Sequence, residues 1–145
     1  MFRRIAKFFK TPFFDKKLFF RALYYSLKYR IITSLLPVKF YVSNFGKAQI
    51  QNSMSPIESQ LKTITSIYKA VRRSTIYLPF GQKCLIEAIV AKKLLKQNSI
   101  DSTLYLGVAR NGQKRLIAHA WLKCGDYIVT GRKGIENFAV VEYYT

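Results

Sequence analysis

Two residues of this chain could supply a thiol nucleophile and its base: Cys84 and His119, which is the only histidine. Cys84 opens an apolar segment, residues 84–96, whose composition predicts a mostly buried helix. A cysteine at the start of a helix meets unpaired N–H groups and the positive end of the helix dipole, and both stabilise a thiolate over a thiol. The alternative is that Cys84 serves only as a small buried hydrophobe.

His119 falls in a predicted strand over residues 114–123, and it lies 35 residues after Cys84. Strand alternation puts His119 and Trp121 on one face of the strand. The small Ala120 then lies on the other face, where a helix could pack closely. An imidazole beside a thiol can take its proton and return it to a leaving group. A structural histidine is the alternative, and Trp121 either shields an ion pair from water or packs as core.

A catalytic triad also needs a group that orients the imidazole, and Asp126, seven residues after His119, is the favoured candidate. The side chain of Gln82 and the backbone N–H of Cys84 are the nearest candidate donors for an oxyanion. A disulfide between Cys84 and Cys124 is a competing use of the two cysteines.

The surrounding pattern indicates an α+β fold in which the helix that carries Cys84 packs on an antiparallel sheet. Residues 13–36 predict a basic amphipathic helix, and Ser55-Pro56-Ile57-Glu58 predicts the capped start of another that ends near Arg73. Asn111-Gly112 marks a hairpin. On the helix over 84–96, three lysines are expected on one solvent face: Lys92, Lys93 and Lys96. The strands are expected at residues 103–109, 114–123, 127–130 and 138–144.

Composition sets further bounds, since 145 residues that are 50% hydrophobic suffice for one folded core. The net charge of +18 is densest in residues 1–50, with 11 basic residues and one acid. Charge alone favours a polyanionic partner, with nucleic acid first. Two cysteines suit a reducing compartment, and no apolar stretch reaches the roughly 20 residues that a spanning helix needs. We therefore expect a cytoplasmic protein that could lie on the inner membrane face.

Neither a zinc-ligand set nor a phosphate-binding glycine motif is present in the sequence, so no cofactor is expected. The division predicted along the chain is a basic helical region with a connector at residues 1–54, followed by a core at residues 55–145.

Several blocks together resemble one known family. They are Cys84-Leu85-Ile86-Glu87-Ala88, Thr103 to Val108, and above all Ala118-His119-Ala120-Trp121-Leu122 with Val129-Thr130-Gly131. This arrangement resembles the transglutaminase-like leader peptidase of lasso peptide biosynthesis, a cysteine protease with a papain/transglutaminase-like fold. The resemblance extends to the N-terminal helix and covers most of the chain.

The resemblance implies a protease that removes the leader from a ribosomally made precursor, with Cys84 as nucleophile and His119 as base. It also implies three partners: the precursor leader, a small leader-binding protein and an ATP-dependent cyclase. Many relatives have an aspartate where this chain has Thr130 and Gly131, so either Asp126 or another group, such as a backbone carbonyl, orients the imidazole. The rivals are a nucleic-acid-binding module, which the aromatic spacing and the lack of a known motif disfavour, and an acyltransferase of the same fold.

Overall fold

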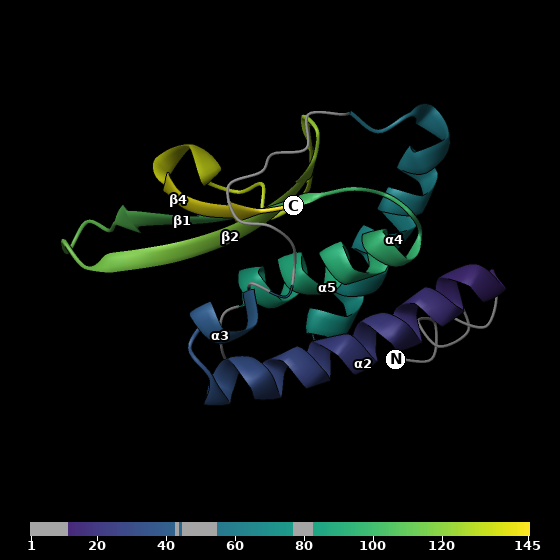
Figure 1. The fold of residues 1–145 in the computed structure, drawn as a ribbon, viewed down its shortest axis with the longest axis horizontal. Coiled ribbons are helices and arrows are strands. Elements are labelled where there is room, and N and C mark those ends of the chain that lie inside the picture. The colour runs from purple at the N-terminus through teal and green to yellow at the C-terminus, as the bar shows by residue number, and fades with distance from the viewer. Residues whose placement is uncertain (1–11, 43, 45–54, 77–82) are drawn as a thin grey trace.

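The computed structural model describes residues 12–42, 44, 55–76 and 83–145. In these ranges, four helices precede and pack beside a single sheet (Figure 1). The helices are α2 (Phe13–Leu35), α3 (Lys39–Val42), α4 (Glu58–Ile76) and α5 (Lys83–Gln97). The strands are β1 (Thr103–Arg110), β2 (Leu116–Cys124), β3 (Tyr127–Thr130) and β4 (Ala139–Tyr144), with a 3-10 turn, η2 (Ile135–Asn137), before β4.

The sheet is antiparallel, with the strand order β3-β2-β1-β4. The central pair is a hairpin in which Gly107 of β1 lies opposite His119 of β2. The side chain of Asn111 closes the hairpin by accepting hydrogen bonds from the backbone N–H groups of Gln113 and Arg115. β3 pairs only with the last residues of β2, Leu122 to Cys124, so β2 has no β3 partner at His119.

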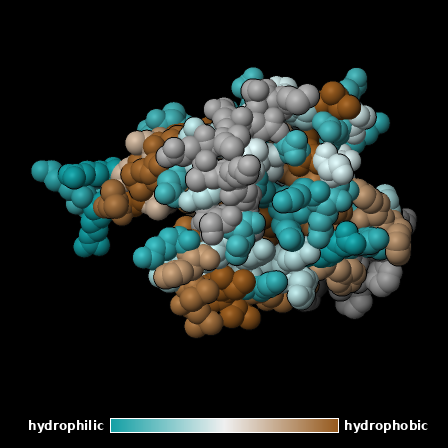
Figure 2. All heavy atoms as spheres, viewed as in Figure 1, coloured by the Kyte–Doolittle hydropathy of each residue, from teal (hydrophilic) through white to brown (hydrophobic). Residues whose placement is uncertain are grey.

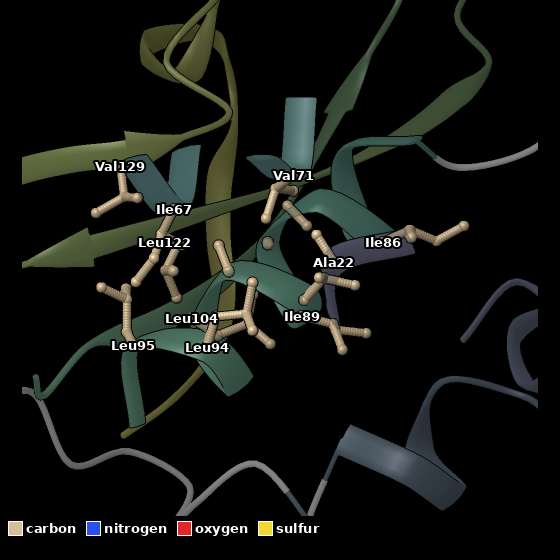
Figure 3. Close-up of a cluster of buried hydrophobic side chains, with 14 of the residues drawn as sticks. Ala22, Ile67, Val71, Ile86, Ile89, Leu94, Leu95, Leu104, Leu122 and Val129 are labelled. Atoms are coloured by element: carbon tan, nitrogen blue, oxygen red, sulfur yellow. The ribbon is translucent and has the colours of Figure 1, made fainter. Parts of the chain in front are cut away.

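The helices form a layer on one face of the sheet, with α5 between the sheet and α2 (Figure 1). α5 is apolar almost all round because α2, α4 and the sheet all contact it. The core joins side chains from all of these elements (Figure 3), among them Ala22, Ile67, Val71, Ile86, Ile89, Leu94, Leu104 and Leu122. Close packing of this kind fixes how α5 lies on the sheet.

A buried pair of serines joins α2 to α4. Ser74 Oγ donates to the carbonyl oxygen of Val71, so the 2.9 Å contact between the two hydroxyls is a bond that Ser26 donates to Ser74. Both side chains are fully buried, and α2 therefore contributes to the same core as α4 and α5.

The expected α+β class is confirmed, and so are the helix over residues 13–36, the helix over 84–96 and the four strands, within about two residues. Three expectations about the helices are wrong. α2 is not amphipathic overall, because apolar side chains lie on its exposed side as well as on its buried side. α4 begins at Glu58, where Gln60 rather than the expected box accepts from the N–H of Ile57, and it continues three residues past Arg73 to Ile76. Lys92 is buried rather than on a solvent face, since its ammonium reaches the carbonyl of Ser102 below the helix.

The predicted boundary between residues 54 and 55 adjoins residues 45–54, which lie outside the described part of the chain. Among the helices that the structure describes, none combines the length and the apolar character needed to traverse a bilayer.

Candidate active site

Cys84 is the second residue of α5, and its side chain is partly exposed. The thiol is free, as is that of Cys124, which is buried at the end of β2. The disulfide considered from the sequence is therefore absent from this structure. Burial raises the pKa of the Cys124 thiol to about 11, so of the two thiols Cys124 is the one suited to a structural role.

The first turn of α5 is held against α4 by a buried carboxylate that the sequence analysis missed. Glu87, one turn after Cys84, accepts hydrogen bonds at Oε1 from Arg72 Nη1 (2.9 Å) and from Thr75 Oγ1 (2.8 Å). Hydrogen bonding and charge attraction from Glu87 raise the pKa of Arg72. Glu87 is the one acidic residue of α5 and lies within its apolar run, which was the available signal for this tether.

His119 projects from the opposite face of the sheet to α5. Ala120, Leu122 and Cys124 of β2 lie in the hydrophobic core, so strand alternation directs His119 and Trp121 the other way. This is the arrangement predicted from the sequence.

Among the residues that the structure describes, the imidazole of His119 makes one hydrogen bond, between Nε2 and the carbonyl oxygen of Gly131 at 2.8 Å. A carbonyl oxygen can only accept, so Nε2 carries the proton. In the neutral ring Nδ1 is then unprotonated and is the nitrogen that can act as a base. The backbone carbonyl left open from the sequence is thus the group that orients the ring.

Gly131 is required at this position by its backbone. Its φ of 74° lies in the left-handed region, and an added Cβ would come within 2.5 Å of the Ala120 carbonyl oxygen and 2.7 Å of Trp121 Cβ. A glycine therefore allows the chain after β3 to cross close over β2 and present its carbonyl to His119.

Aromatic rings surround the imidazole on this face. The ring centroid of His119 lies 5.0 Å from that of Phe138 and 6.0 Å from that of Trp121. Trp121 stacks in turn on Tyr105 at 5.6 Å. Gly107 makes room for this packing, since a Cβ there would lie 2.7 Å from the Trp121 ring. Trp121 is thus buried beside the imidazole, where it restricts both the ring and the access of water.

Asp126 lies elsewhere. It is an exposed residue of the β2–β3 turn, and the five residue steps along β2 from His119 to Cys124 separate that turn from the imidazole by about 17 Å. The structure does not bring Asp126 to His119, and Gly131 takes the position expected for it. Gln82 lies outside the described residues.

Cys84 and His119 lie at the same end of the α5–β2 pair. Lys92 of α5 interacts electrostatically with Cys124 at the far end of β2. Cys84 lies eight residues before Lys92 along α5, a distance of about 12 Å. His119 lies five residues before Cys124 along β2, a distance of about 17 Å. Among the described residues, no hydrogen bond joins the side chains of Cys84 and His119. β3 does not extend along β2 as far as His119, so one edge of β2 lacks a β3 partner there.

The sequence pattern of the transglutaminase-like superfamily matches residues 32–142, about three quarters of the chain. The chain belongs to the transglutaminase-like superfamily. This superfamily includes cysteine proteases and acyltransferases. No curated protein and no solved structure matches the chain.

The transglutaminase-like match covers every described element from the end of α2 to β4, and it includes Cys84, His119 and Gly131. A transglutaminase-like domain with a partly exposed thiol at a helix start, a fixed imidazole and an aromatic surface has the groups for acyl chemistry.

Proposed function

We propose that this transglutaminase-like domain is a cysteine peptidase that removes the leader from a ribosomally made lasso peptide precursor. The observation that carries the proposal is the hydrogen bond from His119 Nε2 to the Gly131 carbonyl, which leaves Nδ1 as the base on the strand that α5 packs against. The blocks around Cys84 and His119, which resemble the leader peptidases, supply the substrate class.

In the proposed reaction His119 Nδ1 takes the proton of Cys84, and the thiolate attacks the carbonyl carbon of the scissile peptide bond. The tetrahedral intermediate collapses to an acyl-thioester while the imidazolium gives its proton to the leaving amine. Water, deprotonated by the same nitrogen, then releases the leader as a carboxylic acid. α5 and the His119 side chain lie on opposite faces of the sheet, so the reaction requires the start of α5 to bring the Cys84 thiol round the edge of β2 that β3 leaves uncovered, to within roughly 3.5 Å of Nδ1 in the substrate complex. This is a larger change than the tightening of an existing hydrogen bond.

Several features support this assignment. Cys84 lies in the first turn of α5, where the helix dipole favours the thiolate and backbone N–H groups could stabilise an oxyanion. The net charge of +18 suits an acidic leader and the docking of acidic partner proteins. The neighbouring reading frames should then encode a short precursor, a small leader-binding protein and a cyclase.

Acyl transfer to an amine is the second candidate, since both reactions pass through the same thioester and the superfamily contains both kinds of enzyme. The test is to mix the purified chain with the cognate precursor and leader-binding protein and to measure product masses. A leader with a free carboxylate and a core peptide with a free amine support the peptidase. An amine adduct of the leader assigns the transferase, and an unchanged precursor contradicts both.

A further inference from the structure

The outer side of α2 carries an apolar ridge that no other described element covers. Its large side chains recur at three-, four- and seven-residue steps, and each is between 50 and 82% exposed. At 100° per residue they fall within an arc of roughly 80°. The ridge consists of Phe13, Phe20, Tyr24, Leu27, Ile31 and Leu35.

The ridge lies on the opposite side of α2 from the face that packs into the protein. That face consists of Leu18, Ala22, Ser26 and Tyr29, whose mean direction is about 180° from the ridge. α2 thus has two apolar faces, which removes the net amphipathicity that the sequence predicted. One face builds the core, and the other needs a different explanation.

Cations flank the ridge on both sides. Lys17, Arg21 and Lys28 lie along one side, and Lys16 and Arg30 lie along the other. Asp15 is the only acidic residue of the helix. A ridge of aromatic and aliphatic side chains between two rows of lysine and arginine is the pattern of a helix that lies in the interface of an anionic membrane.

The shape and the charge discriminate between occupants. The ridge is a straight convex surface about 33 Å long at the edge of the molecule, and hydrophobic atoms gather over the C-terminal half of α2 (Figure 2). A second copy of the chain would bring another +18 charge against the same rows of cations, which opposes self-association. A lipid surface accepts a convex ridge without a matching groove, and its phosphates attract the flanking cations.

We propose that α2 docks the protein on an anionic lipid surface, with the ridge inserted at headgroup depth and the flanking cations against lipid phosphates. The lysine and arginine stems can extend upward from the ridge to reach those phosphates. This inference does not depend on the proposed peptidase activity.

The test is co-sedimentation of the purified chain with vesicles of phosphatidylglycerol and phosphatidylcholine in equal parts, compared with phosphatidylcholine alone. The ridge variant is Tyr24→Gln/Leu27→Gln/Ile31→Gln, which keeps the helix propensity of α2 and leaves its buried face intact. The matched control is Ile57→Gln/Ile76→Gln/Leu116→Gln, because these residues are similarly exposed and lie outside α2. Circular dichroism confirms that each variant folds.

The proposal expects binding to the anionic vesicles that weakens as salt rises, and a loss of at least about tenfold in the ridge variant but not in the control. Wild-type protein that stays in the supernatant with both kinds of vesicle overturns it. Equal binding by wild type and ridge variant also overturns it, because charge alone would then account for the attraction. Wild-type binding to an acidic polypeptide but to neither vesicle assigns the ridge to a protein partner instead.

Discussion

The carbonyl oxygen of Gly131 accepts a hydrogen bond from His119 Nε2 at 2.8 Å, and this backbone group holds the imidazole in the position where a triad would use a carboxylate. Because a carbonyl is uncharged, it fixes the tautomer without stabilising the imidazolium as a carboxylate would. The orientation of the imidazole depends on how the chain after β3 crosses β2, and therefore on the glycine at position 131.

Gly131→Ala should lower the rate of leader removal at least tenfold, on the scale of other losses of imidazole orientation. The new Cβ would meet the Ala120 carbonyl at 2.5 Å, so the chain must move and carry its own carbonyl away from His119. Steady-state rates and the imidazole NMR signals measure the effect.

Gly134→Ala is the matched control for that variant. Gly134 has a φ of 77°, so alanine costs a similar 1–2 kcal/mol or so, but the nearest atom to its added Cβ is Asn137 Nδ2 at 3.8 Å. It should lose stability and keep its rate. Equal rate losses in Gly131→Ala and Gly134→Ala would show that the Gly131 carbonyl has no specific effect on the rate.

Asp126→Asn should leave the rate within about twofold of wild type, since the turn that holds Asp126 lies far along β2 from the imidazole. The same precursor assay measures it. A tenfold or greater loss without a loss of stability would return Asp126 to the site.

Thr75→Val should lower the free energy of unfolding by about 1 kcal/mol, because it removes one of the two hydrogen bonds that hold Glu87 and leaves the volume unchanged. Thr65→Val is the control. Thr65 is exposed on α4, and its hydroxyl donates to the Leu61 carbonyl one turn back, so the change should alter stability by less than about 0.5 kcal/mol. Urea unfolding compares them. Equal effects would show that the contact with Glu87 does not stabilise the fold.

The buried ammonium of Lys92 should make stability rise with pH in the alkaline range. Burial, helped by repulsion from Lys96, lowers its pKa from 10.5 to about 8, while Asp101 and Cys124 oppose the shift. Between these two values the unfolded chain binds more protons than the folded one, so the free energy of unfolding increases with pH.

The comparison with Lys92→Met isolates this effect from the raised pKa of Cys124, which acts in the opposite direction between about 9 and 11. Between pH 7 and pH 9.5, the free energy of unfolding of wild type minus that of Lys92→Met should increase by about 2 kcal/mol. Urea unfolding at the two pH values gives the difference. A constant difference would mean that Lys92 keeps its ordinary pKa in the fold.

The elements of this fold were predictable because local patterns dominate them: the two-residue alternation of β2 and the apolar run of α5. That alternation also placed His119 and Trp121 on one face. The carbonyl of Gly131 has no side-chain signal, so the sequence led to Asp126, whose carboxylate is near in sequence and distant in space. Lys92 was misplaced because lysine spacing marks a polar face, whereas its buried acceptor, the Ser102 carbonyl, comes from a loop that pattern analysis does not locate.

The central claim is that Cys84 is the nucleophile of leader removal, and the most direct measurement compares Cys84→Ala with Cys124→Ala in the reconstituted precursor mixture. Cys124 is the matched control because it is the only other cysteine in the sequence and lies buried at the end of β2, away from His119. The account predicts that Cys84→Ala abolishes formation of the free leader, while Cys124→Ala loses stability but still cleaves. Unchanged leader removal by Cys84→Ala would contradict it.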